Sequence, residues 1–223
     1  MEIAEELYRL FSENGKKEDK GPMEAYMKNH FSFFGIKSPV RKKLVSDFFK
    51  EKEVFKQNFS PELVRKLWSY EEREMQYAAL DYCAKYVKKY SREDVLLFKE
   101  LIVTKSWWDT VDSIAAGLVG TIASLYPELA DEHIECWSLD DHMWLRRTAI
   151  LFQLKYKQQT DAARLYRYIE RNADSKEFFI QKAIGWALRE YSKTSPDSVA
   201  GFIQTHELPK LSIREGSKYL NKS

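Results

Sequence analysis

Helix-start signals recur along the whole chain, and no strand pattern interrupts them. Ser-Pro pairs stand at Ser38-Pro39, Ser60-Pro61 and Ser195-Pro196. Serine is a favoured N-cap residue, and proline fits the first helical position. Together with apolar periodicity, these signals predict helices over residues 2–13, 23–30, 39–56, 61–69, 72–89, 92–103, 107–125, 127–136, 141–157, 160–172, 176–193, 196–206 and 209–220. Paired helices at a period of roughly 35 to 40 residues predict an all-α, HEAT-like helical repeat solenoid.

Composition agrees with a helical repeat array. The 223 residues are 44% hydrophobic and include only 8 Gly and 6 Pro, so few tight turns are expected. We therefore expect residues 1–223 to form one domain, with residues 14–22 as a polar loop. No apolar run is long enough to cross a bilayer, and the N-terminus is an acidic amphipathic helix rather than a signal peptide. Cys83 and Cys136 lie far apart in helical patterns, which disfavours a disulfide or a zinc site and indicates a reduced, cytoplasmic protein.

Basic residues gather in four stretches, although the net charge is only +2. Any anionic partner would need such residues on one surface. The stretches are Lys37 to Lys43, Arg147 with Lys155 on one side of the 141–157 helix, Lys182 with Arg189 and Lys193, and the ridge Lys210, Arg214, Lys218 and Lys222. Each stretch alone is more often a solvated helix face. Together they favour a basic concave groove that binds nucleic acid.

The segment KSWWDTVDSIAAGLVG, residues 105–120, combines an aromatic ring with a carboxylate. Trp108 and Asp112 are four residues apart and share one helical face, while Trp107 lies on the core side. A carboxylate beside an aromatic ring and small residues can stabilise a positive charge that develops on a ligand. The alternative is that Trp108 covers a hydrophobic edge and Asp112 pairs with a nearby Lys or Arg.

Trp186 lies off the apolar stripe of its helix, beside Lys182 and Arg189 and next to Gly185. An aromatic ring among cations, with a glycine that lets a backbone approach, suits stacking on a sugar or base. Tyr26 precedes His30 by one helical turn, and an interface tyrosine is its simplest interpretation.

Three runs of the sequence closely resemble AlkD-type DNA glycosylases, which are bacterial alkylation-repair enzymes built from HEAT-like repeats, and a fourth, N-terminal run is similar to them. The runs are PMEAYMKNHFSFFGI, KSWWDTVDSI, WLRRTAILFQLKYKQ and SKEFFIQKAIGWALREYSKTSPD. The resemblance covers nearly the whole chain. It implies a solenoid whose basic groove holds duplex DNA, and excision of cationic purines such as N3-methyladenine and N7-methylguanine.

The resemblance also assigns roles to individual residues. Asp112 takes the place of the catalytic aspartate, and Trp108 and Trp186 take the places of the two tryptophans that face the sugar of the lesion. The resemblance places Tyr26, Ser38, Lys42, Arg147 and Lys155 at positions that contact DNA, with Arg146 as an alternative to Arg147. Lys182 and Arg189 are expected to contact DNA because they form the basic stripe beside Trp186. No metal, organic cofactor or membrane is implied, and we expect a monomer.

Alkylation makes the purine a cationic leaving group, so positive charge rises mainly on the deoxyribose as the glycosidic bond breaks. A carboxylate at Asp112 can stabilise that charge and orient water, and electron-rich rings can face the sugar. We therefore expect a monofunctional glycosylase that leaves an abasic site. Two other classes stay open: a protein of the same fold that binds damaged or branched DNA without cleavage, and a solenoid scaffold for an acidic protein partner.

Overall fold

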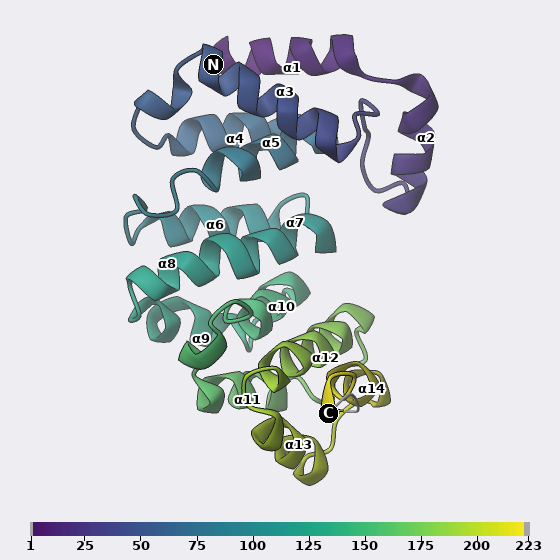
Figure 1. Cartoon of the computed structure of the whole chain (residues 1–223), viewed down its shortest axis with the longest axis vertical. Coiled ribbons are helices and arrows are strands. Elements are labelled where there is room, and N and C mark those ends of the chain that lie inside the picture. Colours follow the sequence, from purple (N-terminus) through teal and green to yellow (C-terminus); the bar gives the residue numbers. More distant parts are fainter. Residues whose placement is uncertain (1, 221–223) are drawn as a thin grey trace. The chain divides into compact units, whose positions relative to one another are not determined.

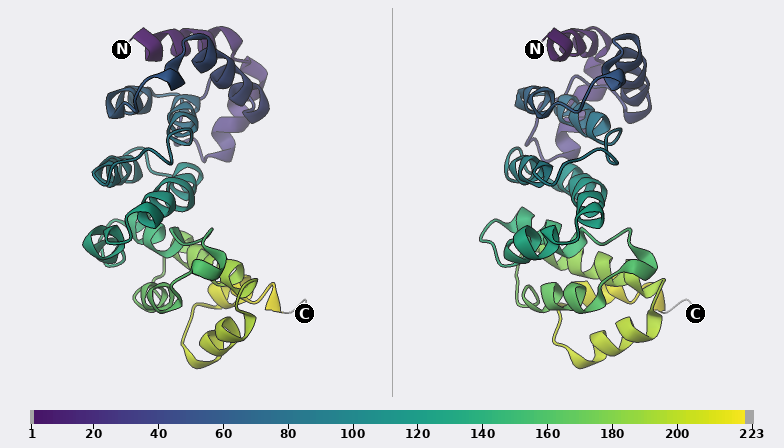
Figure 2. Two further views of the ribbon diagram at one scale, coloured as in Figure 1. Left: turned by 60° about the vertical axis from the view of Figure 1, so that its left-hand side comes forward. Right: turned by 90° about the vertical axis from the view of Figure 1, so that its left-hand side faces the viewer.

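The computed structural model describes residues 2–220, and its regular elements are helices (Figures 1 and 2). Within this range the strand-like pairing is an isolated bridge between Ser32 and Glu72. The predicted all-α, helical-repeat fold class is thereby confirmed. None of the described helices is both long and apolar enough to cross a membrane.

The chain divides into two compact units, Met1–Ser91 and Arg92–Ser223. The first unit contains α1 (Glu2–Asn14), α2 (Lys17–Tyr26), α3 (Ser38–Glu51), the 3₁₀ turn η1 (Val54–Lys56), α4 (Pro61–Ser69) and α5 (Arg73–Cys83). Helix α4 has the predicted boundaries. Ser60 is its N-cap and accepts a hydrogen bond from the Leu63 backbone at 3.1 Å, as the Ser-Pro signal predicts. At α3 the N-cap is Lys37 instead of Ser38.

The second unit begins with α6 (Asp94–Val103), α7 (Trp108–Ser113), the π-helical segment η2 (Ile114–Val119) and α8 (Gly120–Leu125). It continues with the π-helical η3 (Ala130–Ile134), α9 (Glu135–Trp137), α10 (Met143–Leu151), the 3₁₀ turn η4 (Lys157–Gln159) and α11 (Ala162–Glu170). It ends with α12 (Phe178–Ser192), α13 (Pro196–Thr205) and α14 (Lys210–Gly216). Helix α10 packs against α7 and α12, and α12 packs against α14. The core of this unit includes Ile150, Leu165, Ile184 and Leu188.

The prediction that residues 14–22 form a loop is wrong, because most of them belong to α2. The acidic residues Glu18 and Asp19 occupy the first turn of α2, where the helix dipole favours them. Asp19 also forms an ion pair with Lys37 at 2.8 Å. Gly35 lies against the backbone oxygen of Lys16, with a φ of 89° that favours glycine. These contacts outweigh the helix-breaking tendency of Gly21 and Pro22.

The chain that joins α2 to α3 is held by a buried carboxylate. The side chain of Glu74 on α5 accepts hydrogen bonds from the backbone N–H groups of Phe34, Gly35 and Ile36, at 3.0 to 3.1 Å. Burial raises the pKa of Glu74, and the three N–H donors oppose that shift. We call this arrangement the Glu74 clasp.

The helices predicted over 72–89 and 141–157 are shorter in the structure, because side chains bind the backbone where each one ends. The helix predicted over 72–89 stops at Cys83, and the Tyr86 hydroxyl donates to the Val54 and Gln57 carbonyls. The helix predicted over 141–157 stops at Leu151, and the Gln153 side chain exchanges two hydrogen bonds with the Asp161 backbone.

The early end of α10 corrects one inference about charge. Lys155 lies in the turn after the helix, so it does not share a helical face with Arg147 as predicted. The C-terminal helix is also shorter than predicted, and Lys218 lies beyond its end. Lys222 is outside the described residues.

Candidate active site

Asp112 is held by α7, close to where regular α-helical geometry gives way to the π-helical segment η2. Its side chain is only 16% exposed. Just beyond η2, Gly120 approaches the Phe152 backbone closely enough to exclude a side chain, and its carbonyl accepts the Tyr156 hydroxyl at 2.7 Å. Single π-helical turns within α-helices are frequent at functional sites.

Arg147 of α10 binds Asp112 through two parallel hydrogen bonds. Its Nε lies 2.7 Å from Oδ1, and its Nη2 lies 2.9 Å from Oδ2. A two-point contact of this kind fixes the orientation of the carboxylate as well as its charge. The open alternative that Asp112 pairs with an Arg or Lys is thereby confirmed. It is compatible with a catalytic role, because a catalytic carboxylate also has to be positioned.

Arg147 itself is held by α12. Its Nη1 donates to the backbone oxygen of Phe179, and the guanidinium lies 5.9 Å from the centroid of the Phe179 ring. The arginine is 4% exposed. The predicted contact of Arg147 with DNA stays a prediction; the contacts in the structure are with Asp112 and Phe179.

Three aromatic rings pack together beside this ion pair. The centroid of Phe179 lies 5.2 Å from that of Trp107 and 5.0 Å from that of Trp144, and Trp107 lies 5.9 Å from Trp144. The expected core position of Trp107 agrees with this packing. The sequence analysis did not connect Phe179 or Trp144 with Asp112, since the connection runs through Arg147, which is 35 residues from Asp112 in sequence.

Burial and charge act in opposite directions on Asp112. Burial raises the pKa of the Asp112 carboxyl, Arg147 lowers it through hydrogen bonding and charge, and Asp109 raises it again. The net shift is upward. Arg147 therefore favours the ionised form of the Asp112 carboxyl, whereas burial favours the neutral form.

The two tryptophans predicted to face the lesion are both half-buried. Trp108 is the first residue of α7, one turn before Asp112, and Trp186 lies midway along α12 and packs on its apolar core. Because α7 and α12 both pack against α10, the structure brings the helices of Trp108, Asp112, Arg147 and Trp186 together in one unit.

Gly185 does not serve the role expected from the sequence. A Cβ at this position would lie 2.5 Å from the Cβ of Glu215 and 3.0 Å from the backbone oxygen of Ser212. The glycine therefore accommodates α14 and does not leave space for a ligand. Lys182 and Arg189, expected to face DNA, both form ion pairs with Glu215.

The remaining predicted contact residues are exposed. Tyr26 ends α2 and is 68% exposed, and Ser38 and Lys42 lie on the exposed side of α3. These three belong to the first unit. Lys155 is exposed in the second unit, in the turn that follows α10.

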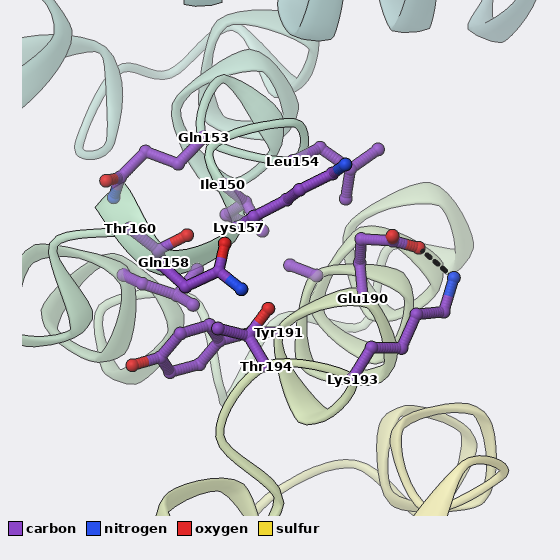
Figure 3. A pocket seen from close by; sticks show the side chains of 12 residues that line it. Ile150, Gln153, Leu154, Lys157, Gln158, Thr160, Glu190, Tyr191, Lys193 and Thr194 are labelled. Atoms are coloured by element: carbon purple, nitrogen blue, oxygen red, sulfur yellow. Dashed lines mark hydrogen bonds and ion pairs between the residues drawn. The ribbon is translucent and has the colours of Figure 1, made fainter.

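A cavity of about 240 Å³ lies between the turn after α10 and the end of α12 (Figure 3). The side chains of Gln158 and Thr160 face it, and an ion pair of 2.6 Å between Glu190 and Lys193 borders it. Its lining includes none of the predicted site residues. Among residues 2–220, no cluster of His, Cys, Asp or Glu side chains has the geometry to hold a metal ion.

The comparisons with known proteins identify the family of the chain. The model of the DNA alkylation repair enzyme family matches residues 7–220. A solved structure described as a predicted DNA alkylation repair enzyme from Enterococcus faecalis is 35% identical and has a TM-score of 0.85. The match covers 94% of this chain and 98% of that one. Among curated proteins, no match was found. The chain belongs to the DNA alkylation repair enzyme family, and this membership supports an enzymatic role in repair of alkylated DNA.

Proposed function

We propose that this protein is a monofunctional DNA glycosylase that excises cationic alkylated purines, such as N3-methyladenine and N7-methylguanine, from duplex DNA. One observation carries the proposal. In a chain of the alkylation-repair family, a mostly buried carboxylate is held in a fixed orientation yet keeps a small exposed fraction. The exposed fraction leaves part of the Asp112 side chain open to a ligand, which a catalytic role requires.

The pairing with Arg147 leaves Asp112 able to act. A carboxylate offers about four lone-pair directions, and the guanidinium uses one on each oxygen. A water molecule or the C1′–O4′ side of a deoxyribose can approach those that remain. As the bond to the cationic purine lengthens, positive charge grows on the sugar, and the ionised carboxylate stabilises it and orients the attacking water.

The tryptophans supply a second source of stabilisation. The faces of Trp108 and Trp186 carry negative electrostatic potential, which attracts an electron-poor sugar as it does a cation. In this proposal Arg147 is a positioning residue: it acts on the reaction through Asp112, and the Phe179 carbonyl holds it in place.

The test is a single-turnover assay on duplex DNA that carries one N7-methylguanine, with alkali to reveal abasic sites. Asp112→Asn should still bind DNA and lose roughly 10²- to 10³-fold in rate. Asp109→Asn makes the same chemical change one turn earlier on α7 and is the matched control; it should stay near the wild-type rate. Circular dichroism would show that both variants are folded.

The outcomes separate the classes of protein. Excision by wild type and Asp109→Asn, but not by Asp112→Asn, supports the proposal. If Asp112→Asn excised at the wild-type rate, the carboxylate would have no catalytic role. Tight, salt-sensitive binding of DNA without excision by wild type would replace the glycosylase with a DNA-binding protein.

A further inference from the structure

A cluster of charged side chains that takes no part in the proposed catalytic step surrounds Glu215 of α14. This residue is only 7% exposed. Its oxygens lie 3.3 Å from Lys182 Nζ, 3.3 Å from Arg189 Nη1 and 2.6 Å from Lys218 Nζ. We call Lys182, Arg189 and Lys218 the Glu215 triad.

The triad carries more positive charge than the carboxylate neutralises. Three cations around one anion leave a local excess of two positive charges. The Lys218 ammonium holds the pKa of Glu215 below its usual range, with Lys182 acting in the same direction, so the carboxylate is ionised at neutral pH. The excess charge is therefore permanent under physiological conditions.

The three cations also keep unused donors at the surface. Their side chains are 38%, 32% and 50% exposed, in the order Lys182, Arg189 and Lys218. An ammonium has three N–H donors and a guanidinium has five, and one contact with Glu215 leaves most of them available. Half-exposed donors with excess positive charge form a receptor for a tetrahedral anion.

The position of the triad relates it to the proposed active site. Around the axis of α12, at about 100° per residue, Lys182 and Arg189 lie within about 60° of Trp186. Lys218 is brought to the same place by the packing of α14 over Gly185 and by a hydrogen bond of 2.9 Å from Ser212 to the Gln181 carbonyl. The C-terminal helix therefore places a cation near the side of α12 that carries Trp186.

We infer that the Glu215 triad is a binding site for one backbone phosphate of DNA, in which Lys218 of the C-terminal ridge acts together with Lys182 and Arg189 of α12. Glu215 holds the cations in place before DNA arrives, so less side-chain entropy is lost on binding. This inference rests on the proposed function only in that the protein binds DNA. It does not require excision.

The first experiment measures binding to an undamaged duplex over a range of salt concentrations. The plot of log K against log salt has a negative slope, and each phosphate contact adds about 0.9 to its magnitude. Lys218→Ala should therefore reduce the magnitude of the slope by about 0.9. Lys56→Ala removes the same charge from an exposed lysine that pairs with Glu53 and lies outside the four basic stretches, so it should change the slope little. If the triad holds a single phosphate, the double variant Lys182→Ala/Lys218→Ala should lose much less than twice that amount.

The second experiment replaces single phosphates of the duplex with uncharged methylphosphonates. At one backbone position, the methylphosphonate should lower the affinity of the wild type but leave the affinity of Lys218→Ala unchanged. Equal sensitivity of both proteins at every position would overturn the inference, as would equal slopes for Lys218→Ala and Lys56→Ala. Binding of inorganic phosphate that depends on Lys218, with DNA affinity unchanged, would also overturn it. Because no damaged base is present, an absence of glycosylase activity leaves these results unaffected.

Discussion

Arg147 and Asp112 face each other through two parallel contacts of 2.7 and 2.9 Å, although 35 residues separate them in the chain. The pair joins α7 to α10, and the Phe179 carbonyl extends the link to α12. A change at Arg147 is therefore expected to reach the reaction through the charge and orientation of Asp112.

Removal of the Arg147 guanidinium should shift the acid limb of the profile of single-turnover rate against pH. In Arg147→Gln, burial would raise the pKa of Asp112 without opposition from a neighbouring cation. The ionised carboxylate would then be lost at a higher pH, so the single-turnover rate should begin to fall at a higher pH than in wild type. Arg147→Lys keeps the charge and loses the two-point contact, so its acid limb should move less. Acid limbs at the wild-type position in both variants would show that Arg147 does not act through Asp112.

A side chain at Gly185 should loosen the C-terminal helix. The new Cβ of Gly185→Ala would lie 2.5 Å from the Glu215 Cβ, and overpacking of this kind costs about 1–3 kcal/mol. Gly201→Ala is the matched control, because nothing lies within 4 Å of its Cβ on α13; it should stabilise the protein by about 0.4–1 kcal/mol. Urea denaturation measures both. Equal stability of the two variants would mean that α14 does not depend on the close approach.

The stability of the second unit should depend on pH in the acid range, because the carboxyl of Glu135 titrates there. Burial acts to raise the pKa of this carboxyl, but hydrogen bonds from Arg167, Arg171 and Tyr168 lower it to about 2 from a usual value of 4.5. A lowered pKa stabilises the fold above the usual value, and the contribution disappears as the pH falls from 4.5 towards 2.

Glu135→Gln should therefore cost about 1–2 kcal/mol at pH 7, after allowance for solvent screening, and much less near pH 2.5. The measurement is the free energy of unfolding at both pH values. Glu132→Gln removes a more exposed carboxylate that pairs with Arg92, and should cost less than about 0.5 kcal/mol. A loss for Glu135→Gln that is independent of pH would assign its effect to packing.

Local signals explain which elements could be predicted from the sequence. Helix α4 has its predicted boundaries because its start depends on Ser60 and Pro61, which act within one turn. The ends of α5 and α10 depend on Tyr86 and Gln153, whose partners are 8 to 32 residues away in the chain, so no local pattern indicates them. No local pattern indicates α2 either, because the contacts that stabilise it come from Gly35 and Lys37, which lie beyond its end.

The site follows the same division. The spacing of Trp108 and Asp112 is local, and it was visible in the sequence. The identity of the partner of Asp112 was not visible, because periodicity does not pair α7 with a particular cation on α10. Lys182 and Arg189 were recognised as a basic stripe, whereas their shared contact with Glu215 depends on the packing of α14 over α12.

The Glu74 clasp has a consequence for the synthesis of the chain. The backbone N–H groups of residues 34–36 donate to the carboxylate of Glu74, which lies 38 to 40 residues further along the chain. While the ribosome extends the chain, α2 and α3 therefore emerge with the segment between them unanchored. Its N–H groups reach their final partner only after α5 has left the exit tunnel, so the N-terminal helices complete their folding late although they are made first.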